Sequence, residues 1–266
     1  MADIFRAVPD PADELSGKTA DGEKKKINSD GGAPSEVPRH IAVIPDGNRR
    51  WARKRLLPAA AGHKAGVEAF RKLLAHCTDI GVKYVTFYAF STENWKRSQA
   101  EVGALMKLLL EKLLDVEKQM GSYRDRVRFV IVGDRSELTP ELVKAIEETE
   151  RKTAGNKDLT AAVCINYGGR SEIVHAAREL ARKVKEGELE PEEIDEKALS
   201  GALYADMPDP DLIIRTSGEL RLSNFLLWQS AYSELYFSDL LWPDFDEAEL
   251  DKAVEAFAAR KRRCGS

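Results

Sequence analysis

Long apolar runs are absent from this chain of 266 residues, and cysteine is scarce. Because no uninterrupted apolar stretch reaches about 18 residues, no membrane-spanning helix is expected. The three cysteines lie far apart without a Cys-x-x-Cys pair, so reduced, structural thiols are expected, which suits a reducing compartment. An excess of one charge is also missing. The formal net charge is −4, so the composition gives no indication of a nucleic-acid partner.

The remaining composition is that of a globular protein, with 43% hydrophobic and 32% charged residues. Residues 1–37 differ from the rest, because they are rich in Asp, Gly, Pro, Lys and Ser and lack apolar periodicity. We expect this segment to be a disordered leader and residues 38–266 to be the folded domain. The leader lacks the apolar core of a secretory signal.

From Pro38 onward, strand patterns alternate with helix patterns. This alternation predicts the α/β class: a single domain with a mostly parallel six-stranded sheet flanked by helices. The predicted strands are 40–45, 83–89, 127–133, 160–166, 211–215 and 234–237. Helix patterns cover 99–119, 139–153, 170–186, 191–204 and 246–262, and a further helix precedes Gly81.

Polar residues follow several predicted strands directly: Asp46, Ser91, Asn166 and Arg215. In parallel sheets, ligands gather at the carboxyl ends of the strands, so these residues are expected to meet at one edge. After Asp46 come a Gly turn and a block of cations, a combination that suits a phosphate ester with a divalent metal. An ordinary strand-turn-helix with a solvated basic face explains this one stretch equally well.

The helix pattern over 99–119 is apolar on more than one face. Two interpretations stay open: a helix buried on two sides, or one whose inner face lines an apolar tunnel.

Four motifs occur in order: Asp46-Gly-Asn-Arg-Arg-Trp-Ala52, Ala89-Phe-Ser-Thr-Glu-Asn-Trp-Lys-Arg97, Arg215-Thr-Ser-Gly-Glu-Leu-Arg-Leu-Ser-Asn-Phe225 and Glu234-Leu-Tyr-Phe237. From Pro38 to the C-terminus the chain thereby resembles the cis-prenyltransferase family. The resemblance implies the undecaprenyl diphosphate synthase-like fold and Mg²⁺-dependent condensation of isopentenyl diphosphate with an allylic diphosphate, farnesyl or geranyl. It further implies a Z-polyprenyl diphosphate product handed to a membrane, a homodimer, and a cytoplasmic location (plastid stroma in a plant or alga).

The first motif carries the implied metal and allylic sites. By resemblance, Asp46 is the Mg²⁺ ligand. The allylic diphosphate is bound by Gly47, Asn48, Arg49 and Arg50, with Trp51 packed beside them and His63 in contact. Bacterial members have an arginine four residues before this histidine, whereas Ala59 stands here. One expected phosphate contact is therefore missing.

The later motifs carry the remaining implied roles. Ser91 and Asn94 are implicated in proton removal, although an amide is a poor base and Asn94 better suits orienting a water or the released diphosphate. Substrate is further bound by Phe90, Thr92, Glu93, Trp95 and Arg97, and isopentenyl diphosphate by Arg215, Arg221, Leu222 and Ser223. Glu234 would complete the Mg²⁺ site across a dimer interface, for which Ser230 to Phe245 is the expected surface. Leu220 replaces a frequent bacterial histidine.

Two alternatives remain within this resemblance. A short-chain, branching or cyclising synthase would use the same scaffold, and the absent arginine at Ala59 keeps this open. Non-catalytic partner subunits also exist, but they lack the Asp-Gly-Asn block that this chain has at Asp46. A nucleotide-binding Rossmann enzyme has little support, because no G-x-G-x-x-G follows the first strand.

Overall fold

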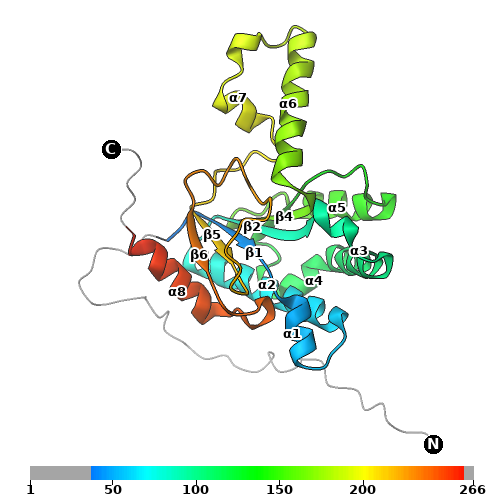
Figure 1. Ribbon diagram of the computed structural model, residues 1–266, viewed down its shortest axis with the longest axis vertical. Coiled ribbons are helices and arrows are strands. Elements are labelled where there is room, and N and C mark those ends of the chain that lie inside the picture. The colour runs from blue at the N-terminus through cyan, green and yellow to red at the C-terminus, as the bar shows by residue number, and fades with distance from the viewer. Residues whose placement is uncertain (1–36, 261–266) are drawn as a thin grey trace, which may run out of the picture. The chain divides into compact units, whose positions relative to one another are not determined.

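The computed structural model describes residues 37–260, and the predicted leader therefore lies almost wholly outside them. Six parallel strands form one sheet in the order β3-β4-β2-β1-β5-β6, which confirms the predicted sheet (Figure 1). The strands are β1 His40–Ile44, β2 Tyr84–Ser91, β3 Val127–Val132, β4 Leu159–Tyr167, β5 Leu212–Arg215 and β6 Glu234–Phe237. The helices are α1 Asn48–Lys54, α2 Ala59–Ile80, α3 Gln99–Leu114, α4 Val116–Met120, α5 Pro140–Thr153, α6 Gly169–Lys185, α7 Glu196–Gly201 and α8 Glu247–Ala258.

Two helix predictions need correction. The pattern over 99–119 is divided at Asp115 into α3 and α4, and an aspartate is a poor helix-interior residue that favours such a boundary. The pattern over 191–204 contains only a 3₁₀ turn at Pro191–Glu193 and the short α7. The carboxylate of Asp195 accepts a hydrogen bond from the Ala198 N–H, so the helix begins there.

Strand residues alternate between the two faces of the sheet, as the pleat requires. Ile41 and Val43 belong to a large core, while Ala42 and Ile44 belong to a smaller core on the other face. Residues of α2, α5 and α8 complete the large core, and α6 and α7 project away from the sheet at the top of Figure 1. Cys77 and Cys164 are buried and unpaired, as expected of structural thiols, and Cys264 lies outside the described residues.

The carboxyl end of β2 is irregular. Its register against β4 shifts between Tyr88 and Phe90 and again between Phe90 and Ser91. Such bulges bend a strand and re-aim its side chains, and they are frequent next to active sites. Among residues 37–260, no helix is long and apolar enough to cross a membrane.

Candidate active site

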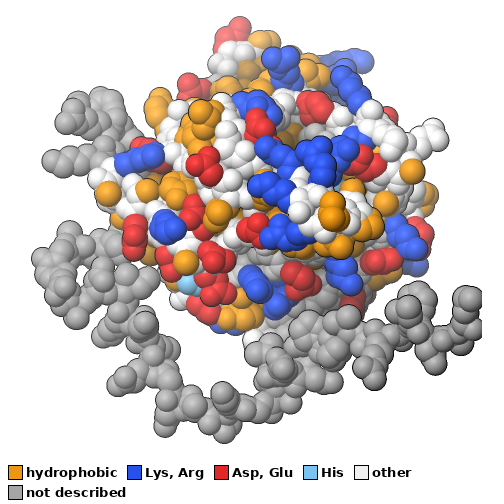
Figure 2. Space-filling model, turned by 60° about the horizontal axis from the view of Figure 1, so that its bottom comes forward, with side chains coloured by type: hydrophobic (Ala, Val, Ile, Leu, Met, Phe, Trp, Pro, Cys, Tyr) orange, Lys and Arg blue, Asp and Glu red, His pale blue; other side chains and the backbone are white. Residues whose placement is uncertain are grey.

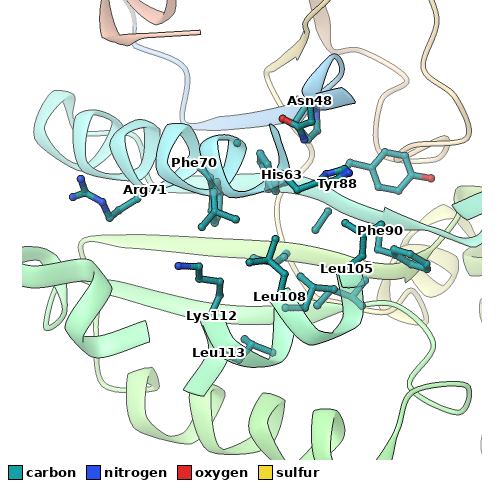
Figure 3. Close-up of a pocket in the computed structure, with 18 of the residues that line it drawn as sticks. Asn48, His63, Phe70, Arg71, Tyr88, Phe90, Leu105, Leu108, Lys112 and Leu113 are labelled. Atoms are coloured by element: carbon teal, nitrogen blue, oxygen red, sulfur yellow. The ribbon is translucent and has the colours of Figure 1, made fainter. Parts of the chain in front are cut away.

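A cavity of about 230 Å³ lies between α2, α3 and the carboxyl halves of the central strands. Its lining includes Pro45 and Asn48, the neighbours of Asp46, and then continues along apolar side chains of α2 and α3. Asn48 and His63 lie toward one end in Figure 3, with Tyr88 and Phe90, whereas Arg71 and Lys112 lie toward the other. The polar end, with Asn48 and His63, is thus separated by a mainly apolar lining from a far end that carries Arg71 and Lys112.

Helix α3 forms one wall of this cavity through Leu105, Leu108, Leu109, Lys112 and Leu113. None of the residues Gln99–Leu114 is fully buried. Other side chains of α3, among them Val102, Met106 and Leu110, pack against the large core, so burial of the helix on more than one side and a cavity-lining face are compatible. The face turned toward the cavity agrees with the tunnel interpretation.

The carboxylate of Asp46 lies at the carboxyl end of β1 and is held by two arginines. Its Oδ1 is 3.1 Å from a guanidinium nitrogen of Arg50, and its Oδ2 accepts a hydrogen bond of 3.1 Å from Arg215. Its backbone is bound by the hydroxyls of Thr216 and Ser217. Residue Gly47, and not Asp46, is the N-cap of α1, so the carboxylate does not serve as a helix cap.

Glycine is required at position 47 by both conformation and space. Its φ is 109°, which side-chain-bearing residues rarely adopt. A Cβ there would lie 2.3 Å from the Ser217 hydroxyl and 2.9 Å from the Leu241 side chain. The backbone at Gly47 therefore lies close against the segments that follow β5 and β6.

Arg215 is the most buried cation of the site, with a side chain 5% exposed. Besides Asp46, it donates hydrogen bonds to the Arg221 carbonyl and the Ser223 hydroxyl. Its Nε has no partner among the described residues. Glu219, which the site prediction did not include, contacts both Arg50 and Arg221. One carboxylate thus faces two predicted phosphate-binding arginines.

The loop after β5 is unusually rich in left-handed backbone. Positive φ angles occur at Ser217, Gly218, Ser223, Asn224 and Leu226. Non-glycine residues in this region cost about 1–3 kcal/mol each, and they cluster at functional sites. Leu222 is half-buried and packs against the smaller core. The loop therefore holds the Arg215 guanidinium through the Arg221 carbonyl and the Ser223 hydroxyl, whereas the Arg221 guanidinium pairs with Glu219.

The second motif forms a tight 3₁₀ turn, Thr92–Lys96, labelled η2, directly after β2. The Asn94 side-chain oxygen accepts a hydrogen bond of 3.0 Å from the Ser91 N–H. In return, the Ser91 side chain accepts a hydrogen bond from the Asn94 N–H. Phe90, Asn94 and Arg97 line the cavity. Because the Asn94 oxygen is already engaged, the geometry agrees with an orienting role better than with a base.

Two asparagines to which the motifs assigned no role position this turn, and one of them, Asn166, was expected at this edge of the sheet. The Trp95 indole donates a hydrogen bond of 2.8 Å to Asn166, whose φ is 51°. The Asn224 side chain donates a hydrogen bond of 2.9 Å to the Glu93 carboxylate and accepts one of 2.9 Å from the Arg170 N–H. Although burial raises the pKa of Glu93, the hydrogen bonds, that from Asn224 foremost, lower it below its usual value. Asn224 thereby joins the second and third motifs. In the sequence, only the position of Asn224 inside the third motif could have indicated a role at the site.

The polar end of the cavity contains two buried atoms without a partner among the described residues, His63 Nε2 and Asn48 Oδ1. Burial lowers the pKa of His63, and the nearby Arg97 charge lowers it further. Unsatisfied buried polar atoms at a cavity wall are the expected signature of a ligand site. Arg49, by contrast, is largely exposed and lies 3.7 Å from Glu101.

Two residues predicted to bind substrate, Trp51 and Thr92, contact other parts of the protein instead of the cavity. Trp51 donates a hydrogen bond of 2.6 Å to Asp244, and Arg55 stacks on its ring at 4.1 Å. Thr92 lies beside Gly168, where an added Cβ would come within 2.8 Å of the Thr92 hydroxyl. These surroundings give Trp51 and Thr92 structural contacts rather than an open position toward the cavity.

Glu234 is at the wrong end of the sheet to join Asp46 within one chain. It pairs with Leu212 at the amino end of β5, whereas Arg215 pairs with Ile44, close to Asp46, at the carboxyl end. Its carboxylate contacts Arg260. Over residues 37–260, no group of three or more His, Cys, Asp or Glu side chains could hold a metal ion. A metal site with both carboxylates would need Glu234 of a second copy.

Comparison with known proteins places this chain in a family. Residues 44–265 match the family model described as "Putative undecaprenyl diphosphate synthase". The chain therefore belongs to this prenyltransferase family, as the four motifs predict. A ditrans,polycis-undecaprenyl-diphosphate synthase ((2E,6E)-farnesyl-diphosphate specific) of Pseudomonas putida is 52% identical over 88% of this chain and 92% of its own length.

Solved structures agree with this assignment. Lavandulyl diphosphate synthase from Lavandula x intermedia, in complex with dimethylallyl diphosphate, has a TM-score of 0.83 and 38% identity, covering 86% of this chain and 99% of its own. A probable undecaprenyl diphosphate synthase from Campylobacter jejuni has a TM-score of 0.71 and 34% identity, covering 87% of this chain and 99% of its own. The predicted fold class is confirmed.

Proposed function

We propose that the chain condenses isopentenyl diphosphate with an allylic diphosphate, releases diphosphate and makes a Z-polyprenyl diphosphate. The observation that carries this proposal is that Asp46, paired with Arg50 and Arg215, directly follows Pro45, which lines a mainly apolar cavity. A diphosphate with a growing hydrocarbon tail needs these two environments in one continuous site. Farnesyl or geranyl diphosphate is the proposed starter.

The residues present fit Mg²⁺ bound through one protein carboxylate. Mg²⁺ commonly takes one or two carboxylates plus substrate phosphates and keeps several waters. Asp46 is partly exposed, and its two carboxylate oxygens contact Arg50 and Arg215. A metal ion with bound phosphate would take the place of these guanidinium groups on the carboxylate. When bound, the metal would neutralise the charge that develops on the departing diphosphate.

The protein groups divide between two anions. Asn48 and His63 line the polar end of the cavity. Together with Arg50, which pairs with Asp46, they are proposed to bind the allylic diphosphate, with Arg49 at its exposed side. The Arg215 guanidinium is held by the Arg221 carbonyl and the Ser223 hydroxyl, and Arg215, Arg221 and Ser223 are proposed to bind isopentenyl diphosphate. Guanidinium groups suit both tasks, because their paired donors match phosphate oxygens.

Ionisation of an allylic diphosphate creates a cation that water would capture, so the reacting carbons must be kept dry. Phe90 and the leucines of α3 supply apolar walls next to the polar end. Asn94 is fixed by Ser91 and lines the same cavity, where it is proposed to orient the group that removes the proton. Positioning and charge stabilisation are therefore the main contributions of the protein.

Assembly, product transfer and location stay proposals. A homodimer is proposed because Glu234 can reach a site near Asp46 only from another copy. A product with a long apolar tail would be handed to a membrane, and a cytoplasmic location would suit that transfer. The short-chain alternative is not favoured, since relatives that are 51–52% identical are undecaprenyl diphosphate synthases by name.

A product assay tests the proposal. Purified protein would receive labelled isopentenyl diphosphate, Mg²⁺ and, separately, dimethylallyl, geranyl or farnesyl diphosphate. We expect a ladder of long cis-polyprenyl products with farnesyl or geranyl diphosphate. One or two additions would instead identify a short-chain synthase, and no incorporation with any starter would support a non-catalytic partner subunit.

A further inference from the structure

The turn between α1 and α2 exposes two leucines. Leu56 is 95% exposed and Leu57 is 45% exposed, so the described part of the chain leaves Leu56 almost uncovered and covers Leu57 only in part. Scattered surface leucines need no explanation, but two consecutive ones at the tip of a turn form a small apolar projection. We refer to residues 53–58 as the leucine tip.

The backbone makes Leu56 an unexpected choice. Its φ is 55°, and the Leu57 N–H donates to the Ala52 carbonyl at 2.9 Å, so Leu56 occupies the left-handed position that ends α1. Glycine usually occupies this position, because a side chain there is strained. Leu56 therefore combines backbone strain with almost no packing inside the chain. Such an outlier is a reason to seek a contact outside the chain.

The surroundings of the tip are cationic. Between Asp46 and Glu68 the sequence contains six Lys or Arg residues and no Asp or Glu, although the whole chain has a formal net charge of −4. Arg53 and Lys54 are exposed, whereas Arg55 is paired with Asp244. Figure 2 shows Lys and Arg side chains gathered on the face that carries α1, with hydrophobic side chains among them.

We propose that the leucine tip docks the protein on an anionic lipid bilayer, with Leu56 and Leu57 inserted and Arg53 and Lys54 on the lipid phosphates. Apolar side chains flanked by cations are the usual recognition elements for such surfaces. The tip immediately precedes α2, and His63 lies about one helical turn into that helix. Docking would therefore bring the polar end of the cavity close to the lipid headgroups. This inference rests on the proposed function, because an amphiphilic product gives docking its purpose.

The test is co-sedimentation of the full-length protein, without substrate, with vesicles of phosphatidylcholine alone or with 30% phosphatidylglycerol. Leu56→Gly removes the side chain and relieves the strained position, so the melting temperature should stay the same or rise. We expect this variant to bind anionic vesicles about tenfold more weakly. Arg53→Gln combined with Lys54→Gln should weaken binding similarly and reduce its salt dependence. The control is Ile194→Ala, which changes a residue 42% exposed among acidic neighbours and should leave binding unchanged.

The proposal is overturned if the unaltered protein does not bind anionic vesicles, if it binds neutral vesicles equally well, or if Leu56→Gly binds like the unaltered protein. A loss of self-association in Leu56→Gly, with vesicle binding retained, would assign the tip to a second copy instead. Turnover in detergent measures the proposed function separately, and Leu56→Gly should retain it there. Failure of condensation in the unaltered protein would thus be distinguishable from failure of docking.

Discussion

The charged cluster beside the active-site cavity and the α3 wall of that cavity are built in opposite ways. In the charged cluster, each important group is held by several others: Arg215, for example, contacts Asp46, Ser223 and the backbone of Arg221. Along the apolar wall, none of the residues of α3 is fully buried. Charges that stabilise a reaction must be fixed in advance, whereas a hydrocarbon tail needs only room and the exclusion of water. The difference predicts where substitutions affect catalysis and where they affect product or stability.

The largest effect is expected from Asp46→Ala. This change removes the proposed metal ligand and the shared partner of Arg50 and Arg215, so turnover should fall roughly a thousandfold or more. Steady-state kinetics at saturating substrate would measure it, and circular dichroism should show an intact fold. Near-normal turnover would contradict the metal assignment.

Arg215→Ala should chiefly weaken the binding of isopentenyl diphosphate. Removing a buried, multiply bonded guanidinium should cost about 3 kcal/mol of binding free energy, which is roughly a hundredfold in KM for that substrate. The KM for the allylic substrate should change much less. Arg215→Lys keeps the charge but lacks the paired donors, so its KM for isopentenyl diphosphate should lie between those of the unaltered protein and Arg215→Ala. An unchanged KM for isopentenyl diphosphate would contradict the role.

Stability should separate the cavity wall from the close-packed core. Leu142, on α5, is 2% exposed, and Leu142→Ala should reduce the free energy of unfolding by about 2–5 kcal/mol. Leu109 on α3 faces the cavity, so Leu109→Ala should cost less than about 1 kcal/mol while altering the distribution of product lengths. Chemical denaturation and product sizing measure both effects. Equal losses of stability would show that the wall is packed like the core.

The smallest effect concerns the link between the second and third motifs. Asn224→Gly tolerates the φ of 65° but removes the side-chain bonds to Glu93 and to the Arg170 N–H, and should lower kcat/KM about tenfold. A double-mutant cycle with Glu93→Ala should show a coupling of about 1 kcal/mol. The matched control, Asn224→Asp, keeps the acceptor for Arg170 but faces Glu93 with a like charge. Strict additivity in the cycle would mean that the two motifs act independently.

Much of the candidate site was predictable, because parallel strands bring their carboxyl ends to one edge. Asp46 follows β1, whereas Ser91 and Arg215 end β2 and β5, and the motifs that contain them are enough to indicate one shared site. Other contacts were not predictable from spacing. The contact of Glu219 with two arginines and the clamp made by Asn224 depend on a loop with several positive φ angles, which no residue pattern specifies.

The sequence by itself determined the family, the α/β class and the strands, because hydrophobic period and motif order are local properties of the chain. Only the tertiary structure decided that Glu234 lies at the other end of the strands from Asp46, since strand direction and register are set by pairing between distant segments. It also decided that Leu105, Leu108, Leu109 and Leu113 of α3 face a cavity. A periodic pattern marks an apolar face but not what that face meets, which depends on how closely neighbouring helices pack.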